Sequence, residues 1–191
     1  MGSQDPVIYQ PLHPSIRAKL DSEYVAFHDK VLQYVPPAES MPWDPRSRLI
    51  PSPLARGGQQ PVEVGKVYDR DLGPQQVRVF VPEGDAPDGG WPGMMWLHGG
   101  GWVNGGLNSE NGFLRHVCKR KSPLSVMKSF LNHGLDVKCL VVSINYRHAP
   151  EYPYPTAVED ALYGLAWILS APNAASLQLD TCRLAIGGLS A

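Results

Sequence analysis

The sequence predicts an α/β fold in which helices cover the faces of a mostly parallel sheet. Three observations predict it: strand-like segments come first, helical and strand-like segments then alternate, and one strand-like run is apolar almost throughout. That run, residues 140–144, is rich in β-branched side chains, as is typical of a strand buried on both faces. The chain has 191 residues, of which 43% are hydrophobic and 18% charged, so it can bury a substantial core.

Residues 1–60 are predicted to form an N-terminal cap or extension. Residues 12–35 carry apolar side chains at helical spacing, and Pro36 and Pro37 end the pattern, so a helix is expected there. Residues 36–61 are rich in proline, serine, glycine and arginine and are expected to be irregular. Two interpretations stay open: an extension without chemistry, or a lid over a pocket.

Residues 61–191 carry the pattern of the sheet and of the helices on its faces. Strands are predicted at 62–72, 76–81, 94–97, 140–144 and 184–186. A helix is predicted over 108–119, with Asn108 or Ser109 as its cap, and a second helix starts near Pro155. The second helix is expected to bury one apolar stripe, made of Val158, Leu162, Leu165 and Leu169.

The strand predicted at 94–97 runs directly into the sequence His-Gly-Gly-Gly-Trp at 98–102. Glycines let the backbone turn freely and let other groups approach its N–H groups. Two fixed N–H groups that point at one spot stabilise an oxyanion better than they stabilise a neutral carbonyl. This segment therefore has the composition of an oxyanion hole, which is one half of an acyl-transfer site.

The other half of such a site is the sequence Gly-Leu-Ser-Ala at 188–191, which directly follows the last predicted strand. It matches the first four positions of the Gly-x-Ser-x-Gly motif, which places a serine on a sharp turn between strand and helix. Four residues are a weak match alone. The preceding strand and the glycine loop supply the context in which the match becomes specific.

These segments, with Tyr-Arg-His-Ala-Pro-Glu-Tyr-Pro-Tyr-Pro at 146–155 and Glu-Asp at 159–160, make the family resemblance plain. The chain resembles the N-terminal part of the hormone-sensitive-lipase group of α/β-hydrolases, which are carboxylesterases and lipases. The resemblance covers about residues 60 to 191. It implies an α/β-hydrolase fold and hydrolysis of carboxylic esters through a serine nucleophile and an acyl-enzyme.

The resemblance also assigns roles to individual residues. Ser190 is expected to be the catalytic nucleophile, and the N–H groups of Gly100, Gly101 and Ala191 are expected to form the oxyanion hole. His98 is expected to orient the glycine loop rather than to react.

The acid and the histidine of the triad are expected after Ser190, because the chain order in this fold is serine, then Asp or Glu, then His. Asp160 is therefore interpreted as structural, with Arg147 and Glu151 as neighbours in the same charged cluster. The sequence thus predicts an α/β-hydrolase fold truncated after the nucleophile elbow. We expect the 191-residue chain on its own to be poorly soluble or inactive.

Residues 120–135 are an atypical insertion relative to this family. They can form a surface helix, with Ser122 as its cap and Pro123 in its first turn. They can equally be a translated intron, because Arg-Lys-Ser at 120–122 can be encoded by codons that contain the splice-donor sequence GTAAGT. Both alternatives stay open.

Composition excludes several other classes of function. A formal net charge of -1 argues against nucleic-acid binding, and no apolar run is long enough to span a membrane. No signal peptide is visible, and the three scattered cysteines suit reduced thiols in a cytoplasmic protein rather than a metal site. We expect a small-molecule ester as substrate, no metal and no cofactor, and the oligomeric state stays open.

Two other functions compete with the esterase. A non-catalytic α/β-hydrolase-like protein could use the old pocket to bind a small molecule, although such a binder needs neither the serine nor the glycine loop. A nucleotide-binding sheet could use residues 99–106 as a phosphate loop, but the Lys-Ser/Thr ending of that loop is missing.

Overall fold

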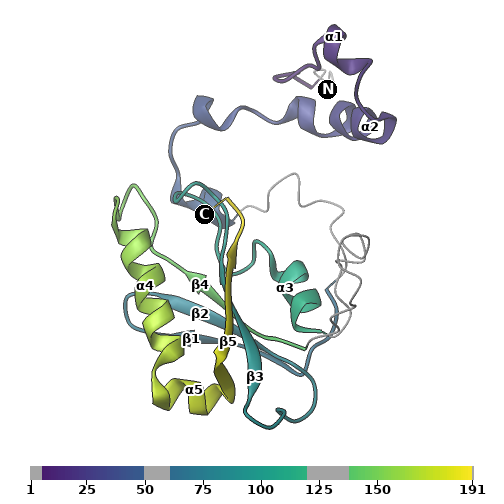
Figure 1. The fold of residues 1–191 in the computed structure, drawn as a ribbon. Helices are drawn as coiled ribbons and strands as arrows, with labels where there is room; N and C mark the ends of the chain where they lie inside the picture. The colour runs from purple at the N-terminus through teal and green to yellow at the C-terminus, as the bar shows by residue number, and fades with distance from the viewer. Residues whose placement is uncertain (1–5, 50–60, 120–137, 191) are drawn as a thin grey trace, which may run out of the picture. The chain divides into compact units, whose positions relative to one another are not determined.

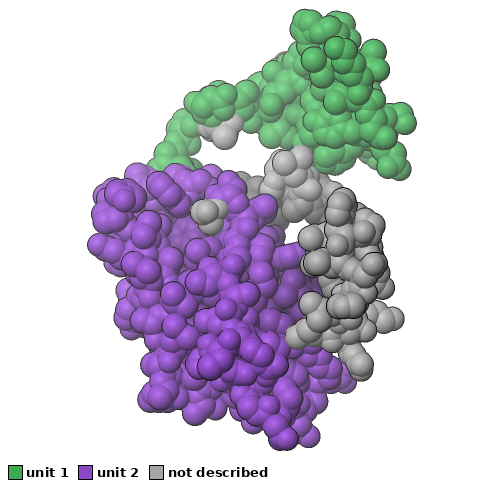
Figure 2. Space-filling view, viewed as in Figure 1, with its two compact units in different colours: residues 1–57 green, residues 58–191 purple. Residues whose placement is uncertain are grey.

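A computed structural model describes residues 6–49, 61–119 and 138–190. The chain divides into two compact units, unit 1 with residues 1–57 and unit 2 with residues 58–191 (Figures 1 and 2). The predicted insertion at 120–135 lies outside the described residues, as does Ala191.

Unit 1 consists of short helical segments. They are α1 (Pro14–Arg17), α2 (Ser22–Lys30) and three 3-10 turns, η1 (Leu32–Tyr34), η2 (Ala38–Ser40) and η3 (Pro45–Leu49). The prediction of a single helix over 12–35 is therefore wrong. The side chain of Asp21 accepts a hydrogen bond from the Glu23 amide (2.8 Å) and starts a new helix there, as N-cap residues do.

Unit 2 is built on a five-stranded sheet (Figure 1). Its strands are β1 (Lys66–Asp71), β2 (Gln76–Val81), β3 (Trp91–Leu97), β4 (Leu140–Asn145) and β5 (Leu179–Gly188), in the order β1-β2-β4-β3-β5. Strands β3, β4 and β5 are parallel, whereas β2 pairs antiparallel with both β1 and β4. The predicted α/β fold class is confirmed, with a parallel half that carries the segments singled out by the sequence.

Helices cover both faces of this sheet (Figure 1). Helix α3 (Asn111–Cys118) packs on one face through Leu114 and Cys118. Helices α4 (Thr156–Leu169) and α5 (Ala171–Leu177) pack on the other face, where Ile168 and Leu177 join the larger apolar cluster. Because β4 lies between two neighbours and under helices on both faces, its first five residues are buried, as its apolar sequence predicts.

Helix α4 buries a different face from the predicted one. Of the four predicted residues, Leu165 packs against the core, but Val158, Leu162 and Leu169 are 42%, 62% and 44% exposed, and the buried positions include Gly164 and Ile168. A Cβ at Gly164 would lie 2.8 Å from the Ile144 side chain, so the helix approaches β4 through a residue without a side chain. The orientation of α4 thus follows from the close approach of Gly164 to β4, rather than from burial of the largest apolar side chains.

Candidate active site

The glycine loop and the segment of Ser190 leave the sheet from neighbouring strand ends. Strands β3 and β5 are paired in parallel, with Leu97 opposite Gly188. The amide of Leu189 donates to the Leu97 carbonyl oxygen (3.2 Å), which extends the pairing by one residue. A Cβ at Gly99 would lie 2.6 Å from the Leu189 carbonyl oxygen, so the two segments are also in contact just beyond the sheet.

The topology makes this edge of the sheet the expected place for a ligand. The chain leaves β3 towards α3 on one face of the sheet, and it leaves β4 towards α4 on the other face (Figure 1). In open α/β sheets, ligands bind beyond the carboxyl ends of strands where successive connections diverge in this way. The glycine loop lies at one of these strand ends, and the segment 146–155 lies at the other.

The glycine loop has a backbone that side chains would prevent. Gly100 and Gly101 have φ values of 139° and 60°, and the amides of Val103 and Asn104 both donate to the Gly100 carbonyl oxygen (3.2 and 2.9 Å). A Cβ at Gly100 would lie 2.0 Å from the Asn104 carbonyl oxygen. Glycine is therefore required at Gly100 both for its backbone angle and for space.

Ser190 has a backbone conformation that non-glycine residues seldom adopt. It is exposed, it lies two residues beyond the end of β5, and its φ is 54°. Left-handed backbone at a non-glycine residue costs of order 1–3 kcal/mol, and it is concentrated at functional sites. The third predicted oxyanion donor, Ala191, lies outside the described residues.

His98 is buried beneath the loop and holds it from inside. Its ring is 0% exposed and stacks on Tyr146, with ring centroids 4.2 Å apart. Nδ1 lies 3.0 Å from the Gly99 carbonyl oxygen, and because a carbonyl only accepts, Nδ1 carries the proton. Burial lowers the pKa of the imidazole below its ordinary value, against the opposing effects of the Gly99 carbonyl and the Asn145 side chain.

In the charged cluster predicted after β4, Arg147 and Asp160 connect the loop after β4 to helix α4. Asp160 is 2% exposed and accepts hydrogen bonds from the Arg147 amide, Nε and Nη2 (2.8, 2.9 and 2.7 Å). The Asp160 carbonyl accepts from the Gln75 side chain (2.8 Å). The hydrogen bonds to Asp160 raise the pKa of Arg147 above its ordinary value. This carboxylate is fully engaged in joining the loop after β4 to helix α4.

Two aromatic side chains lie beside the glycine loop. Trp102, which directly follows Gly101, is 44% exposed, and its ring is 6.0 Å from that of Tyr154. The Trp102 carbonyl accepts from the Ala149 amide (3.0 Å), so the loop is hydrogen-bonded to the segment 146–155.

Three residues around the loop are not predicted by the sequence pattern. A Cβ at Gly105 would lie 2.2 Å from the Gly99 carbonyl oxygen, and the Tyr146 hydroxyl donates to the His98 carbonyl oxygen (2.6 Å). Glu110, rather than Asn108 or Ser109, occupies the N-cap position of α3, and its side chain makes no capping hydrogen bond. The sequence signal for Gly105 is its glycine neighbour at 106, and Tyr146 begins the segment 146–155 that carries the family resemblance, whereas nothing local marks Glu110.

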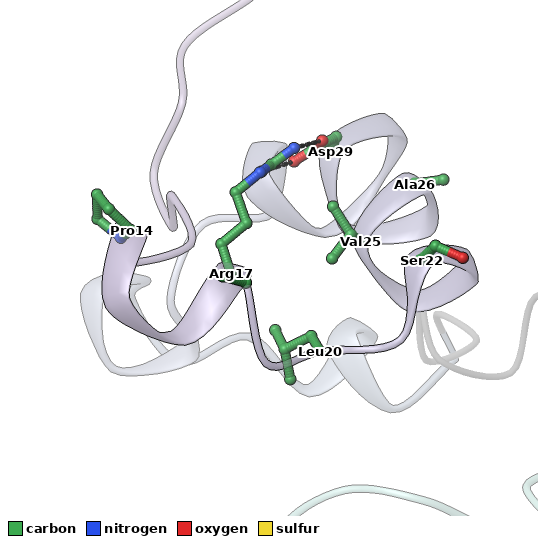
Figure 3. Close-up of a pocket in the computed structure, with 8 residues that line it drawn as sticks. Pro14, Arg17, Leu20, Ser22, Val25, Ala26 and Asp29 are labelled. Carbon is green, nitrogen blue, oxygen red and sulfur yellow. Dashed lines mark hydrogen bonds and ion pairs between the residues drawn. The ribbon is translucent and has the colours of Figure 1, made fainter.

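Unit 1 contains an open groove of about 590 Å³ between α1 and α2 (Figure 3). Its lining is mostly apolar, and Arg17 pairs with Asp29 beside it, with Nη1 2.8 Å from Oδ1. None of the residues that line it belongs to the predicted catalytic set. The choice between an extension and a lid for this region stays a prediction.

Within the described ranges, no group of three or more His, Cys, Asp or Glu side chains could hold a metal ion. In the same part of the chain, no helix combines the length and the apolar character that crossing a membrane requires.

Comparison with known proteins identifies the class to which this fold and site belong. A family model described as the alpha/beta hydrolase fold matches residues 94–191, which are 98 of the 191 residues. The chain therefore belongs to the alpha/beta hydrolase family. The predicted resemblance to carboxylesterases is also confirmed, because the relatives include carboxylesterase NlhH and esterase LipI of Mycobacterium tuberculosis.

Three relatives show how far the similarity extends. An AB hydrolase superfamily protein of Schizosaccharomyces pombe is 34% identical, over 95% of this chain and 50% of its own length. Esterase LipI of Mycobacterium tuberculosis is 31% identical, over 67% of this chain and 34% of its own length. The structure of an ester hydrolase from the metagenome of Lake Arreo, bound to a bipyridine phosphonate derivative, has 27% identity and a TM-score of 0.63, over 93% of this chain and 50% of that one. The chain thus spans half or less of the length of these relatives.

Proposed function

We propose that the protein that carries this chain hydrolyses small carboxylic esters, with Ser190 as the nucleophile. The observation that supports this most directly is the left-handed backbone of Ser190, just beyond a parallel strand and beside the glycine loop. A nucleophile elbow has this position, because the strained turn exposes the hydroxyl above the strand ends.

The proposed reaction is acyl transfer in two steps. The Ser190 hydroxyl oxygen attacks the ester carbonyl carbon while a base takes its proton, and the carbonyl oxygen becomes an oxyanion. The N–H groups of Gly100, Gly101 and Ala191 donate hydrogen bonds to that oxyanion. The C–O bond then breaks, the alcohol leaves with the proton, and water hydrolyses the acyl-enzyme. We assign the base to a histidine that follows Ser190, in agreement with the chain order of this fold.

Relatives support the substrate class. One, NlhH of Mycobacterium tuberculosis, is named carboxylesterase and another ethyl acetate hydrolase, and the Lake Arreo structure is that of an ester hydrolase in complex with a derivative of bipyridine phosphonate. Phosphorus reagents of this kind resemble the tetrahedral intermediate of ester hydrolysis, which is the species that an oxyanion hole is built to bind.

Two experiments test the proposal. One is reaction with a fluorophosphonate, with the adduct located by peptide mass spectrometry, and the other is hydrolysis of p-nitrophenyl acetate and butyrate by the untreated protein. We expect one adduct, on Ser190, and loss of both labelling and hydrolysis in Ser190→Ala. Ser176→Ala, at an exposed serine of α5, is the matched control and should behave as the parent. A protein that binds small esters but forms no adduct at Ser190 would be the non-catalytic binding protein instead.

A further inference from the structure

Glu110 lies immediately before α3, yet its side chain contacts the glycine loop instead of capping that helix. The amide of Gly99 donates to Glu110 Oε1 at 3.5 Å, a long contact beyond the usual range of about 2.7–3.2 Å. Glutamate at such a position commonly serves the helix N-terminus, but here the side chain makes no capping bond. The carboxylate is therefore available to the loop, eleven residues earlier in the chain.

The surroundings of Glu110 are those of a held, partly buried carboxylate. Burial raises its pKa above the ordinary value, whereas the Gly99 amide, the Trp96 indole and its own amide favour the charged form. Burial raises the pKa of Tyr146 to about 12, and the negative charge of Glu110 adds to this effect. Among the described residues, no cation forms a salt bridge with Glu110, and the groups that favour its charged form are the Gly99 amide, the Trp96 indole and its own amide.

The peptide between His98 and Gly99 is thus held at both of its polar atoms. The His98 carbonyl oxygen accepts from the Tyr146 hydroxyl (2.6 Å), and the Gly99 amide donates to Glu110. The next peptide, between Gly99 and Gly100, is held at its carbonyl by His98 Nδ1 (3.0 Å). Since a peptide is planar with its C=O and N–H antiparallel, fixing the Gly99 carbonyl also fixes the direction of the Gly100 N–H.

We propose that Glu110 is a positioning residue of the oxyanion hole: by accepting from the Gly99 N–H it fixes the His98–Gly99 peptide, from which the next peptide starts, and so helps to direct the Gly100 N–H at the developing oxyanion. This inference rests on the proposed ester hydrolysis. Glycine peptides rotate easily, so a loop with consecutive glycines needs such external contacts to stay preorganised. A misdirected donor lowers the rate strongly, because oxyanion stabilisation depends on donors that are already aligned before the reaction.

The test compares Glu110→Ala with Glu110→Gln in the protein that carries this chain. The glutamine keeps an oxygen that accepts from Gly99, whereas the alanine has none. We expect Glu110→Ala to lower kcat and the rate of Ser190 phosphonylation by about 10- to 100-fold with little change in KM, and Glu110→Gln to stay within about threefold of the parent. Glu63→Ala, at a side chain that is 94% exposed, is the control and should leave both rates unchanged.

Hydrogen exchange at the Gly99 amide supplies a readout that does not depend on catalysis. Exchange should quicken by at least about tenfold in Glu110→Ala and not in Glu110→Gln, because only alanine removes the acceptor. Parental rates in Glu110→Ala, or equal losses in both variants, would overturn this inference alone. Failure of Ser190 to react in the parent protein would overturn the proposed function and this inference with it.

Discussion

Replacement of Gly100 by alanine tests whether the shape of the glycine loop depends on the absence of a side chain there. Its φ of 139° is unfavourable for alanine, and the new Cβ would lie 2.0 Å from the Asn104 carbonyl oxygen. Gly73, in the turn between β1 and β2, is the matched control. Its φ is 96°, but a Cβ there would meet nothing within 4 Å.

The expected difference follows from these two surroundings. The left-handed backbone costs alanine about 1–2 kcal/mol at either position. At Gly100 the Asn104 carbonyl also has to move, which weakens the two hydrogen bonds that the Gly100 carbonyl accepts, at about 0.5–1.5 kcal/mol each. We therefore expect a loss of about 2–5 kcal/mol for Gly100→Ala and about 1–2 kcal/mol for Gly73→Ala. At about 2–4 °C per kcal/mol for a chain of this length, the melting temperature should fall by about 10 °C and about 4 °C, respectively.

Thermal unfolding followed by tryptophan fluorescence measures both variants, since four of the five tryptophans lie in unit 2. In the same samples, phosphonylation of Ser190 should slow by about 10²-fold or more in Gly100→Ala, because the displaced amide no longer meets the oxyanion. It should be unchanged in Gly73→Ala. Equal melting temperatures for the two variants would refute the argument that Asn104 limits the space at Gly100.

Three further outcomes are expected. Asp160→Ala should lower the melting temperature far more than Asp180→Ala, because only the first removes a buried carboxylate that accepts three hydrogen bonds; similar effects would contradict this. Burial raises the pKa of Cys118 to about 12, so at pH 8 its thiol stays protonated, and iodoacetamide should modify the exposed Cys182 first, as read by peptide mass spectrometry. Burial lowers the pKa of His98, so the folded protein binds fewer protons than the unfolded chain below about pH 6.5. The free energy of unfolding, measured in urea, should therefore fall as the pH is lowered from about 7 to about 5. A flat profile would argue against a neutral buried ring.

Segments whose environment is set by their own sequence could be predicted. The apolar run of β4 indicates a central strand, and the strand predicted at 76–81 has the observed bounds of β2 because its alternation repeats with the period of a strand. Helix α5 is not predicted, since its seven residues carry little apolar periodicity and end at Gln178 with a left-handed φ of 51° rather than at a glycine. Strand β5 is also longer than the three residues predicted, because Asp180 to Arg183 carry no apolar alternation.

Features that depend on tertiary approach could not be predicted from local pattern. The orientation of α4 follows from how closely Gly164 approaches Ile144, and a glycine in a helical pattern only lowers the expectation of a helix. The contact between Glu110 and Gly99 joins residues eleven positions apart, and it forms only because the chain between β3 and α3 brings the start of α3 back to the end of β3. The glycine motif could be found in the sequence, whereas the groups that hold it in place could not.

The glycine loop obtains its shape from neighbours rather than from its own preferences. In the unfolded chain, Gly100 and Gly101 can adopt many backbone conformations besides the one in the loop. The conformational entropy that they lose on folding is therefore large and has to be offset by other interactions. Two contacts from separate places in the chain offset this cost: the buried ring of His98 under the loop and the hydroxyl of Tyr146 after β4. Gly105 acts differently, because its lack of a side chain leaves room for the Gly99 carbonyl. Both contacts are formed on folding, before any substrate arrives. Donors fixed in this way need no reorganisation when charge develops, which is the condition under which backbone amides stabilise an oxyanion better than water does.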